Sequence, residues 1–220
     1  MIAEALNNLR AAIPQGVALV AVSKFHPAER LQEAYDAGQR IFAESRPQEL
    51  AAKVPQLPAD IEWHFIGHLQ TNKLKLVLPY VSLVQSVDSF HLLEAIDKWG
   101  SDNGKTVDVL LELHLGAEET KHGFSEEEIV TILNTAGEGG SHIRIRGLMG
   151  MATNTEDKGV IEADFARIEA LFQRIRAEHP ELRNTFTELS IGMSGDWPIA
   201  VRHGATMVRI GTDIFGEREY

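Results

Sequence analysis

The sequence predicts an α/β fold, a single (β/α)8 TIM barrel with an extra N-terminal helix. Short apolar runs rich in Val and Ile alternate with amphipathic helical segments along the chain, which is the pattern of parallel strands joined by helical crossovers. Eight such runs can be counted, and a length of 220 residues suits one barrel better than two full domains. We therefore expect one domain over residues 1–220.

The eight expected strands are short apolar runs of the kind that is buried on both faces of a parallel sheet. They lie at residues 17–22, 40–43, 61–66, 82–86, 107–113, 143–148, 186–190 and 206–210. The segment after the last strand is too short for a full covering helix. We expect an N-terminal helix to cover this gap with an apolar side formed by Ile2, Ala5, Leu6 and Leu9.

The helical segments between the strands carry local start and stop signals. Pro27 suits a first helical position, and Gly38 suits the left-handed residue that follows a helix. Ser125 and Glu128 have the spacing of a capping box, in which each residue satisfies an N–H group of the other. Residues 164–178 repeat apolar side chains along one helical face.

The composition excludes several classes of function. The chain has 21 basic and 32 acidic residues, a formal charge of −11, so its surface repels nucleic acid and anionic lipid. The absence of Cys rules out disulfides and thiol chemistry and agrees with a reducing compartment. The N-terminus lacks the features of a signal peptide, and no apolar run is long enough to span a membrane. We expect a cytoplasmic protein.

Two loops near the C-terminus are candidates for binding an anionic group. In such barrels, phosphates commonly bind at the loops that follow strands seven and eight. The loop at 188–198 contains Gly192, Ser194 and Gly195, and the loop at 209–216 contains Gly211 and Thr212. Gly residues allow the backbone to approach a ligand, and free N–H groups at a helix start attract phosphate. The alternative is two ordinary Gly-containing turns.

Two cationic residues stand at informative positions in these strands. Lys24 closes the apolar run of the first strand, where it is either a solvated end residue or a partly desolvated amine able to form an imine with an aldehyde. Arg209 lies inside the apolar run of the last strand, where an unpaired guanidinium is costly to bury. Arg209 therefore either reaches water at the strand end or faces an acceptor, which can be a ligand atom.

The histidines do not predict a metal site. His64 and His68 are four residues apart, but they lie across a strand end rather than along a helix, and no carboxylate follows at ligand spacing. We therefore expect no metal, and we expect His64 to be hydrogen-bonded in the core or to line a pocket. No Ser–His–Asp pattern, nucleophile elbow or P-loop motif occurs in the sequence.

Six separated motifs, in order along nearly the whole chain, resemble those of the pyridoxal phosphate homeostasis proteins. The motifs are VALVAVSKFHP, WHFIGHLQTNK, VQSVDS, KHGF, IRGLMGM and LSIGMSGDWPIAVRHGATMVRIGTDIFGER. This family consists of single-domain relatives of the alanine racemase and ornithine decarboxylase barrel. The resemblance therefore implies a barrel of the alanine racemase-like type that binds pyridoxal 5′-phosphate (PLP).

The resemblance also implies roles for individual residues. Lys24 matches the lysine that holds PLP as a Schiff base, and Arg209 matches the arginine that faces the pyridine nitrogen. The phosphate cradle and the surroundings of the ring match a larger set: Met193, Ser194, Gly211 and Thr212 for the phosphate, and His64, Ser86 and Met149, with less defined roles, for the ring. One departure is Ser45, which stands where the family usually has Asn.

Three functions remain open from the sequence. The first is a non-catalytic carrier or buffer in intracellular PLP homeostasis, which affects vitamin B6 and amino-acid balance, because a guanidinium at the pyridine nitrogen keeps the ring a poor electron sink. The second is a weak amino-acid racemase or an imine-forming aldolase, and the third is a scaffold for partner proteins. We expect PLP as cofactor, free amino acids or PLP-dependent apo-enzymes as partners, and a monomer.

Overall fold

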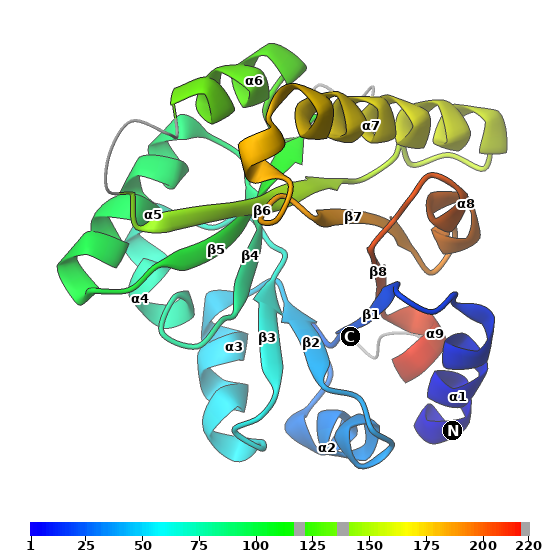
Figure 1. Cartoon of the computed structure of the whole chain (residues 1–220). Coiled ribbons are helices and arrows are strands. Elements are labelled where there is room, and N and C mark those ends of the chain that lie inside the picture. The colour runs from blue at the N-terminus through cyan, green and yellow to red at the C-terminus, as the bar shows by residue number, and fades with distance from the viewer. Residues whose placement is uncertain (117–121, 136–140, 217–220) are drawn as a thin grey trace.

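The computed structural model describes residues 1–116, 122–135 and 141–216. Its eight strands form a closed parallel barrel in which each strand pairs with its neighbours in sequence order and the last strand pairs with the first (Figure 1). The predicted α/β barrel is thus confirmed. Lys121 of the KHGF motif and residues 217–220 lie outside the described residues.

All eight expected strands are present, with ends that differ by at most three residues and with both ends of β5 as expected. They are β1 (Ala18–Val22), β2 (Ile41–Glu44), β3 (Glu62–Phe65), β4 (Leu83–Val87), β5 (Val107–Leu113), β6 (Ile143–Gly150), β7 (Glu188–Met193) and β8 (Met207–Ile210). The largest difference is at β7. Phe186 belongs to the preceding turn, where its N–H donates to Leu182 at 2.7 Å, and the strand continues through Gly192 to Met193.

Helices cover the outside of the barrel (Figure 1). They are α1 (Ile2–Ala12), α2 (Ala28–Asp36), α3 (Pro47–Lys53), α4 (Leu74–Val77), α5 (Phe90–Asn103), α6 (Glu126–Thr135), α7 (Lys158–Glu178), α8 (Trp197–Arg202) and α9 (Thr212–Phe215), with 3-10 turns η1 (Val54–Gln56), η2 (Thr71–Lys73) and η3 (Pro180–Leu182). Within the described ranges, no helix combines the length and the apolar character that a membrane span requires.

The local helix signals are largely confirmed. The Ser125 hydroxyl accepts from the Glu128 N–H at 3.2 Å, and the Glu128 carboxylate accepts from the Ser125 N–H at 2.8 Å, so the capping box forms. Gly38 follows α2 with a φ of 87°. The expectation for Pro27 is off by one position. Pro27 caps α2 in an extended conformation (ψ 161°) because the chain enters this helix from the loop after β1.

The N-terminal helix fills the gap beside the last strand, as expected. Helix α9 has only four residues, and α1 lies against α9 and α2 (Figure 1). Ile2, Leu6 and Leu9 are buried there. Arg10 ties α1 to the end of α2 through a 2.7 Å hydrogen bond to the carbonyl of Ala37.

Two apolar cores hold the barrel together. The larger core lies between the strands and the surrounding helices. The smaller core fills part of the barrel interior with one apolar side chain from each of six strands: Val20, Ala43, Leu83, Leu110, Met149 and Met207. Partly buried apolar side chains pack against this core. Buried polar side chains also lie in the interior, and they connect to the site described next.

Candidate functional site

A cavity of about 230 Å³ opens at the carboxyl ends of the strands. We call it the mouth cavity. Its lining comes from the ends of β1, β3, β6, β7 and β8 and the loops that follow them: Val22, Lys24, His26, Ile66, Met149, Met151, Met193, Ser194, Gly195, Arg209, Gly211, Thr212 and Gly216. Six of the seven predicted cofactor-binding residues lie in this lining, together with Met149. The seventh, His64, does not.

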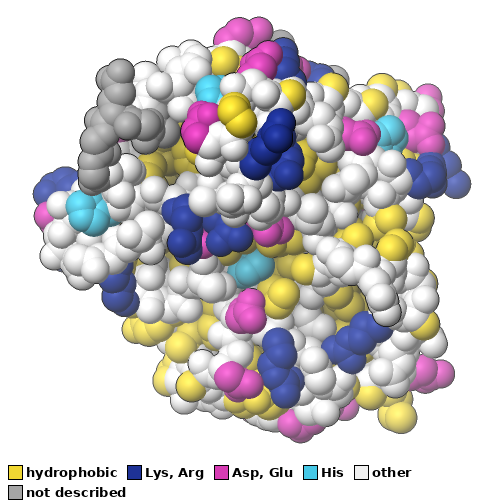
Figure 2. Space-filling model, viewed as in Figure 1, with side chains coloured by type: hydrophobic (Ala, Val, Ile, Leu, Met, Phe, Trp, Pro, Cys, Tyr) yellow, Lys and Arg dark blue, Asp and Glu magenta, His cyan; other side chains and the backbone are white. Residues whose placement is uncertain are grey.

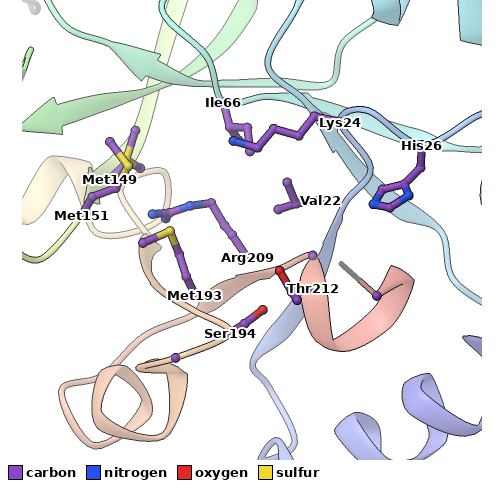
Figure 3. A pocket seen from close by; sticks show the side chains of 13 residues that line it. Val22, Lys24, His26, Ile66, Met149, Met151, Met193, Ser194, Arg209 and Thr212 are labelled. Carbon is purple, nitrogen blue, oxygen red and sulfur yellow. The ribbon is translucent and has the colours of Figure 1, made fainter. Parts of the chain in front are cut away.

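Arg209, on β8, and Lys24, two residues after the end of β1, both line the mouth cavity. Strands β1 and β8 pair in parallel, with Val20 opposite Arg209. In Figure 3 the amine of Lys24 and the hydroxyl groups of Ser194 and Thr212 lie on opposite sides of the cavity, with Arg209 between them. The cavity therefore offers an amine at one side and hydroxyl donors at the other.

Arg209 is buried and hydrogen-bonded, so of the two alternatives left by the sequence the structure favours the one in which it faces acceptors. Its side chain donates to the carbonyl and the hydroxyl of Ser190 at 2.7 and 2.8 Å, and to the carbonyl of Gly150 at 3.0 Å. Burial lowers the pKa of Arg209 to about 10, and the nearby carboxylates of Glu112 and Asp196 oppose this shift. The guanidinium thus stays charged at neutral pH, with N–H donors beyond these three available to a ligand.

The fixed position of Arg209 depends on a chain of hydrogen bonds through the barrel interior. The Ser190 hydroxyl donates to Gln85 Oε1 at 2.7 Å, and Gln85 Nε2 lies 2.8 Å from His64 Nδ1. Burial lowers the pKa of His64 to about 4, so its ring is neutral at neutral pH. With Gln85 as the donor, Nδ1 accepts and the ring proton lies on Nε2.

His64 is buried, hydrogen-bonded and lines a pocket, as expected, but that pocket is not the mouth cavity. His64 pairs with Ala43 and Leu83 in the middle of the barrel and lines a second cavity, which we call the amino-end cavity, at the opposite end. That cavity also has about 230 Å³ and is bounded by residues near strand starts, among them Asp108, Glu188 and Met207. Side chains on a strand alternate between faces, so the inward-facing residue nearer the mouth is Ile66, two positions after His64.

Ser86 and Ser45 also lie outside the lining of the mouth cavity. Ser86 is buried, and its hydroxyl donates to the carbonyl of Gly67 at 2.6 Å, so it joins the loop after β3 to β4. The backbone of Ser45 packs so tightly against Gly67 that a Cβ at Gly67 would lie 2.1 Å from the Ser45 oxygen. The departure from the family pattern at Ser45 therefore falls beside this loop contact.

The end of β7 and the turn that follows it have a fixed backbone conformation. Gly192 has a φ of 91°, and a Cβ there would lie 2.6 Å from Ala200 Cβ, so only Gly fits. The Asp196 carboxylate accepts from the Met193 N–H at 2.5 Å and fixes the turn. Burial raises the pKa of Asp196.

The donors of this cradle fit an anionic group with several oxygens. Among the described residues, no acceptor is found for the N–H groups of Ser194, Gly195 and Thr212, and two hydroxyls lie beside them. A Cβ at Gly195 would meet nothing within 4 Å, so the cavity has open space there. The donor set, with Lys24 and Arg209 in the same cavity, provides the local positive field that the net charge of −11 otherwise opposes.

A buried ionic network that the sequence analysis missed holds the backbone on both sides of Lys24. Lys53 Nζ donates to the Ser23 carbonyl at 2.9 Å, to Glu44 at 2.6 Å and to Glu49 at 2.8 Å. The Ser23 hydroxyl donates to Glu44 at 2.7 Å. Burial raises the pKa of Glu44 to about 7, against the opposing charge of Lys53.

Beyond Lys24, the same network fixes Phe25. Its N–H donates to Glu49 at 2.6 Å, its φ is 71°, and the guanidinium of Arg46 lies 4.3 Å from the centre of its ring. A left-handed conformation is uncommon for a bulky residue, so it persists only where its surroundings hold it. The signals in the sequence were Glu44 in an apolar strand and the i,i+4 spacing of Glu49 and Lys53.

The surface of the face shown in Figure 2 agrees with the charge analysis. Acidic, basic and histidine side chains are interspersed on it, and no broad basic patch is visible there. Nucleic-acid binding needs clustered Lys and Arg that displace counterions from phosphates. This face therefore does not have the character of a nucleic-acid interface.

The fold and the mouth cavity define a barrel protein with a lysine, a buried arginine and an anion cradle at the carboxyl ends of its strands. The family described as "Alanine racemase, N-terminal domain" matches residues 1–219. Among curated proteins, the pyridoxal phosphate homeostasis protein of Vibrio alginolyticus is 36% identical over 212 residues, which is 94% of this chain and 89% of that protein. The one of Synechocystis is 37% identical over 214 residues, 96% of each chain.

Similar solved structures support the same family relationship. PipY of Synechococcus elongatus is 38% identical, and the similarity covers 98% of this chain and all of PipY. The TM-score is 0.92 for PipY without PLP and 0.88 for PipY with PLP bound. The chain belongs to the pyridoxal phosphate homeostasis protein family, which shares the fold of the alanine racemase N-terminal domain.

Proposed function

We propose that this chain binds PLP in the mouth cavity, as a Schiff base on Lys24, and acts in PLP homeostasis without robust catalysis. The observation that carries the proposal is the meeting of Lys24 and Arg209 in one cavity with the hydroxyls of Ser194 and Thr212. The PLP-bound structure of PipY and the names of the relatives support it.

Each part of the cavity suits one part of this cofactor. The amine of Lys24 would hold the aldehyde carbon of PLP as an imine, with the loss of one water molecule. The N–H and hydroxyl donors of Ser194, Gly195 and Thr212 suit the three phosphate oxygens. Met149 and Met151 offer flexible apolar side chains that pack against a flat ring.

Arg209 favours the binding of PLP without catalysis. Bound PLP supplies an electron sink for carbanions next to its imine carbon. The charged guanidinium would donate a hydrogen bond to the pyridine nitrogen. Because a guanidinium cannot accept a hydrogen bond, that nitrogen would have to stay unprotonated to act as the acceptor. Because an unprotonated ring withdraws electrons less strongly, proton abstraction from a bound amino acid is weakened.

The alternative of a weak racemase needs a second base on the other face of the cofactor. The described residues include two tyrosines. The hydroxyl of Tyr35 donates to Asp60 at 2.7 Å, and Tyr80 is exposed. Neither lines the mouth cavity. A carrier is therefore the better-supported function.

An absorbance titration with PLP tests the cofactor proposal. The wild-type protein is expected to gain the absorption band of an imine at about 420 nm. Borohydride is expected to reduce this imine to a stable adduct on Lys24. Lys24→Ala removes both, whereas Lys98→Ala, a change at an exposed lysine, retains both. A wild-type protein that stays colourless with excess PLP would refute the proposal.

Proton exchange tests the lack of catalysis. Holo-protein is incubated with D- and L-alanine in deuterium oxide, and α-proton loss is followed by NMR. We expect exchange far below enzyme-like turnover, which is on the order of 1 per second or faster. Fast exchange that depends on Lys24 would establish the racemase instead.

We further propose a cytoplasmic monomer with one domain over residues 1–220 that exchanges PLP with free amino acids or with PLP-dependent apo-enzymes. Sedimentation of the holo-protein is expected to give the mass of one chain, 24.4 kDa. Mixing with an apo-enzyme is expected to restore its activity faster than the spontaneous release of PLP allows. Equal rates would reduce the role to storage.

A further inference from the structure

A second group of ligand atoms lies in the loops after β3, β4 and β5, on residues that do not line the mouth cavity. His68, Asp88 and His122 meet there, and one ligand atom from each lies within 4.8 Å of the others. His68 Nδ1 is 2.7 Å and His122 Nδ1 is 4.0 Å from Asp88 Oδ2. The two imidazole rings stack with centroids 4.5 Å apart and planes 17° apart.

The backbone on each side of this group is held in place. Ser86 lies at the end of β4, two residues before Asp88, and its hydrogen bond to Gly67 joins β4 to the loop that carries His68. Next to His122, the Phe124 N–H donates to the Glu112 carbonyl at 2.8 Å, and the His114 N–H donates to the Phe124 carbonyl at 3.0 Å. The three ligands thus come from three anchored loops, and a metal site benefits from such preorganised ligands.

The solvent exposure of the three residues has the pattern of an open metal site. The Asp88 side chain is 3% exposed, whereas those of His68 and His122 are 51% and 61% exposed. The carboxylate is thus buried in the protein, and the two imidazole rings have room to rotate at the surface. A tetrahedral zinc ion with ligands at about 2.0 to 2.2 Å needs ligand atoms roughly 3.3 Å apart, which small rotations of the two exposed rings provide.

We propose that His68, Asp88 and His122 bind a divalent transition metal ion, with zinc as the best match. Two imidazoles and one carboxylate are a common three-ligand set for zinc, which leaves a fourth position for water. Imidazole ligands select zinc, nickel and copper over magnesium and calcium. The bound ion connects the loops after β3, β4 and β5 and stabilises this part of the barrel rim.

This site could not be found from sequence spacing. The sequence analysis paired His68 with His64 and therefore predicted no metal. In the structure, His64 lies inside the barrel, and the partners of His68 are 20 and 54 positions further along the chain. The pairing of β3 with β4 and of β4 with β5 brings the three loops together at one edge of the sheet.

Equilibrium dialysis against zinc, read by elemental analysis, tests the site. We expect one zinc ion per chain in the wild-type protein and a rise in the midpoint of thermal unfolding with zinc, because an ion that binds only the folded state stabilises it. Cobalt at the same site is expected to give the visible absorption of a tetrahedral ion. Asp88→Ala and His122→Ala are expected to lose the stoichiometric zinc, the thermal shift and the cobalt spectrum.

Two controls separate this site from other sources of metal binding. His203→Ala removes a comparable histidine, whose Nδ1 lies 2.8 Å from Glu169, and is expected to keep the zinc. Lys24→Ala is expected to keep it as well, so chelation by PLP cannot explain the signal and the two proposals fail independently. Asp88→Asn, similar in shape, replaces Asp88→Ala if circular dichroism shows that the latter does not fold. Absence of stoichiometric zinc, or equal binding by the folded Asp88 and His122 variants, overturns the proposal.

Discussion

Lys53 Nζ and Glu44 Oε1 lie 2.6 Å apart, and both side chains are almost completely shielded from solvent. Glu44 ends β2, and Lys53 ends α3, so the pair joins a barrel strand to an outer helix. The same Lys53 amine also donates to the carbonyl of Ser23, the residue before Lys24. The position of the proposed PLP lysine is thus connected to a charge pair that itself does not line the mouth cavity.

Lys53→Met is expected to lower both stability and PLP affinity. Removing one partner of a buried ion pair leaves the other charge uncompensated and costs about 3 to 5 kcal/mol. The backbone of Ser23 also loses a hydrogen bond, so Lys24 is less well oriented. Urea unfolding and a PLP absorbance titration measure the two effects.

Lys98→Met provides the matched control for this change. Lys98 pairs with Asp102 at 3.0 Å, but both side chains are exposed, so its loss is expected to cost less than about 1 kcal/mol and to leave PLP binding unchanged. An equal, small effect of both substitutions would show that the buried pair does not hold the Lys24 loop.

The neutral, buried ring of His64 predicts a loss of stability in acid. The pKa of His64 is lowered to about 4 in the folded protein, whereas its ordinary value is 6.5. Between these values the unfolded chain binds a proton that the folded chain does not, so the contribution of this group is present above pH 6.5 and is lost as the pH falls toward 4. A shift of this size corresponds to about 3 kcal/mol.

Unfolding free energies of the wild type and His64→Gln between pH 4 and pH 7 measure this contribution. The variant removes the titrating group, so its curve is expected to be flatter than that of the wild type. Parallel curves for wild type and His64→Gln would contradict the assignment.

Gln85 is expected to be a positioning residue for Arg209. Gln85→Leu leaves the Ser190 hydroxyl and His64 Nδ1 without their present partner, and buried unsatisfied polar groups cost about 1 to 3 kcal/mol each. The Ser190 hydroxyl, which accepts from Arg209, also becomes free to rotate. We expect lower stability and a changed absorption maximum of bound PLP.

The absorption spectrum distinguishes positioning from a merely structural role. Gln56→Leu is the control, because Gln56 is exposed and only donates to the Ala52 carbonyl, and it is expected to change stability by less than about 0.5 kcal/mol. A Gln85→Leu protein that is destabilised but binds PLP with a wild-type spectrum and affinity would show that the chain of hydrogen bonds does not reach the cofactor.

The fold was predictable because its signals are local. Runs of Val and Ile that are buried on both faces mark the strands, and pairs such as Ser125 and Glu128 mark helix starts. In the candidate site, Lys24 and Arg209 stood out as cations at the end of or within apolar strands. Their meeting in one cavity follows from the pairing of the first and last strands, which barrel closure requires.

The rest of the site depends on contacts between distant parts of the chain. We expected His64 near the cofactor ring, but it lines the amino-end cavity, and Ile66 on the same side of the chain lines the mouth cavity. The sequence shows which residues of a strand face inward but not which of them lies at the mouth. The network of Lys53, Glu44 and Glu49 joins a helix, a strand and the loop after β1, which no spacing rule connects.

Gly192→Ala is expected to weaken PLP binding by distorting the loop that carries Ser194. Its φ is 91°, and the added Cβ would lie 2.6 Å from Ala200 Cβ and 3.0 Å from Trp197 Cα, so α8 must shift. Forcing a methyl group into packed structure costs about 1 to 3 kcal/mol beyond the strain of the backbone conformation. Thermal unfolding and PLP titration measure both effects.

Gly16→Ala separates the two causes. Gly16 has a nearly identical φ of 92°, but a Cβ there would meet nothing within 4 Å. This variant therefore carries only the backbone strain, about 1 to 2 kcal/mol, and leaves the mouth cavity intact. If both variants lose the same stability and both keep wild-type PLP affinity, the close packing of Gly192 against α8 does not shape the phosphate cradle. A larger loss of stability for Gly192→Ala, together with weaker PLP binding in that variant alone, supports the cradle.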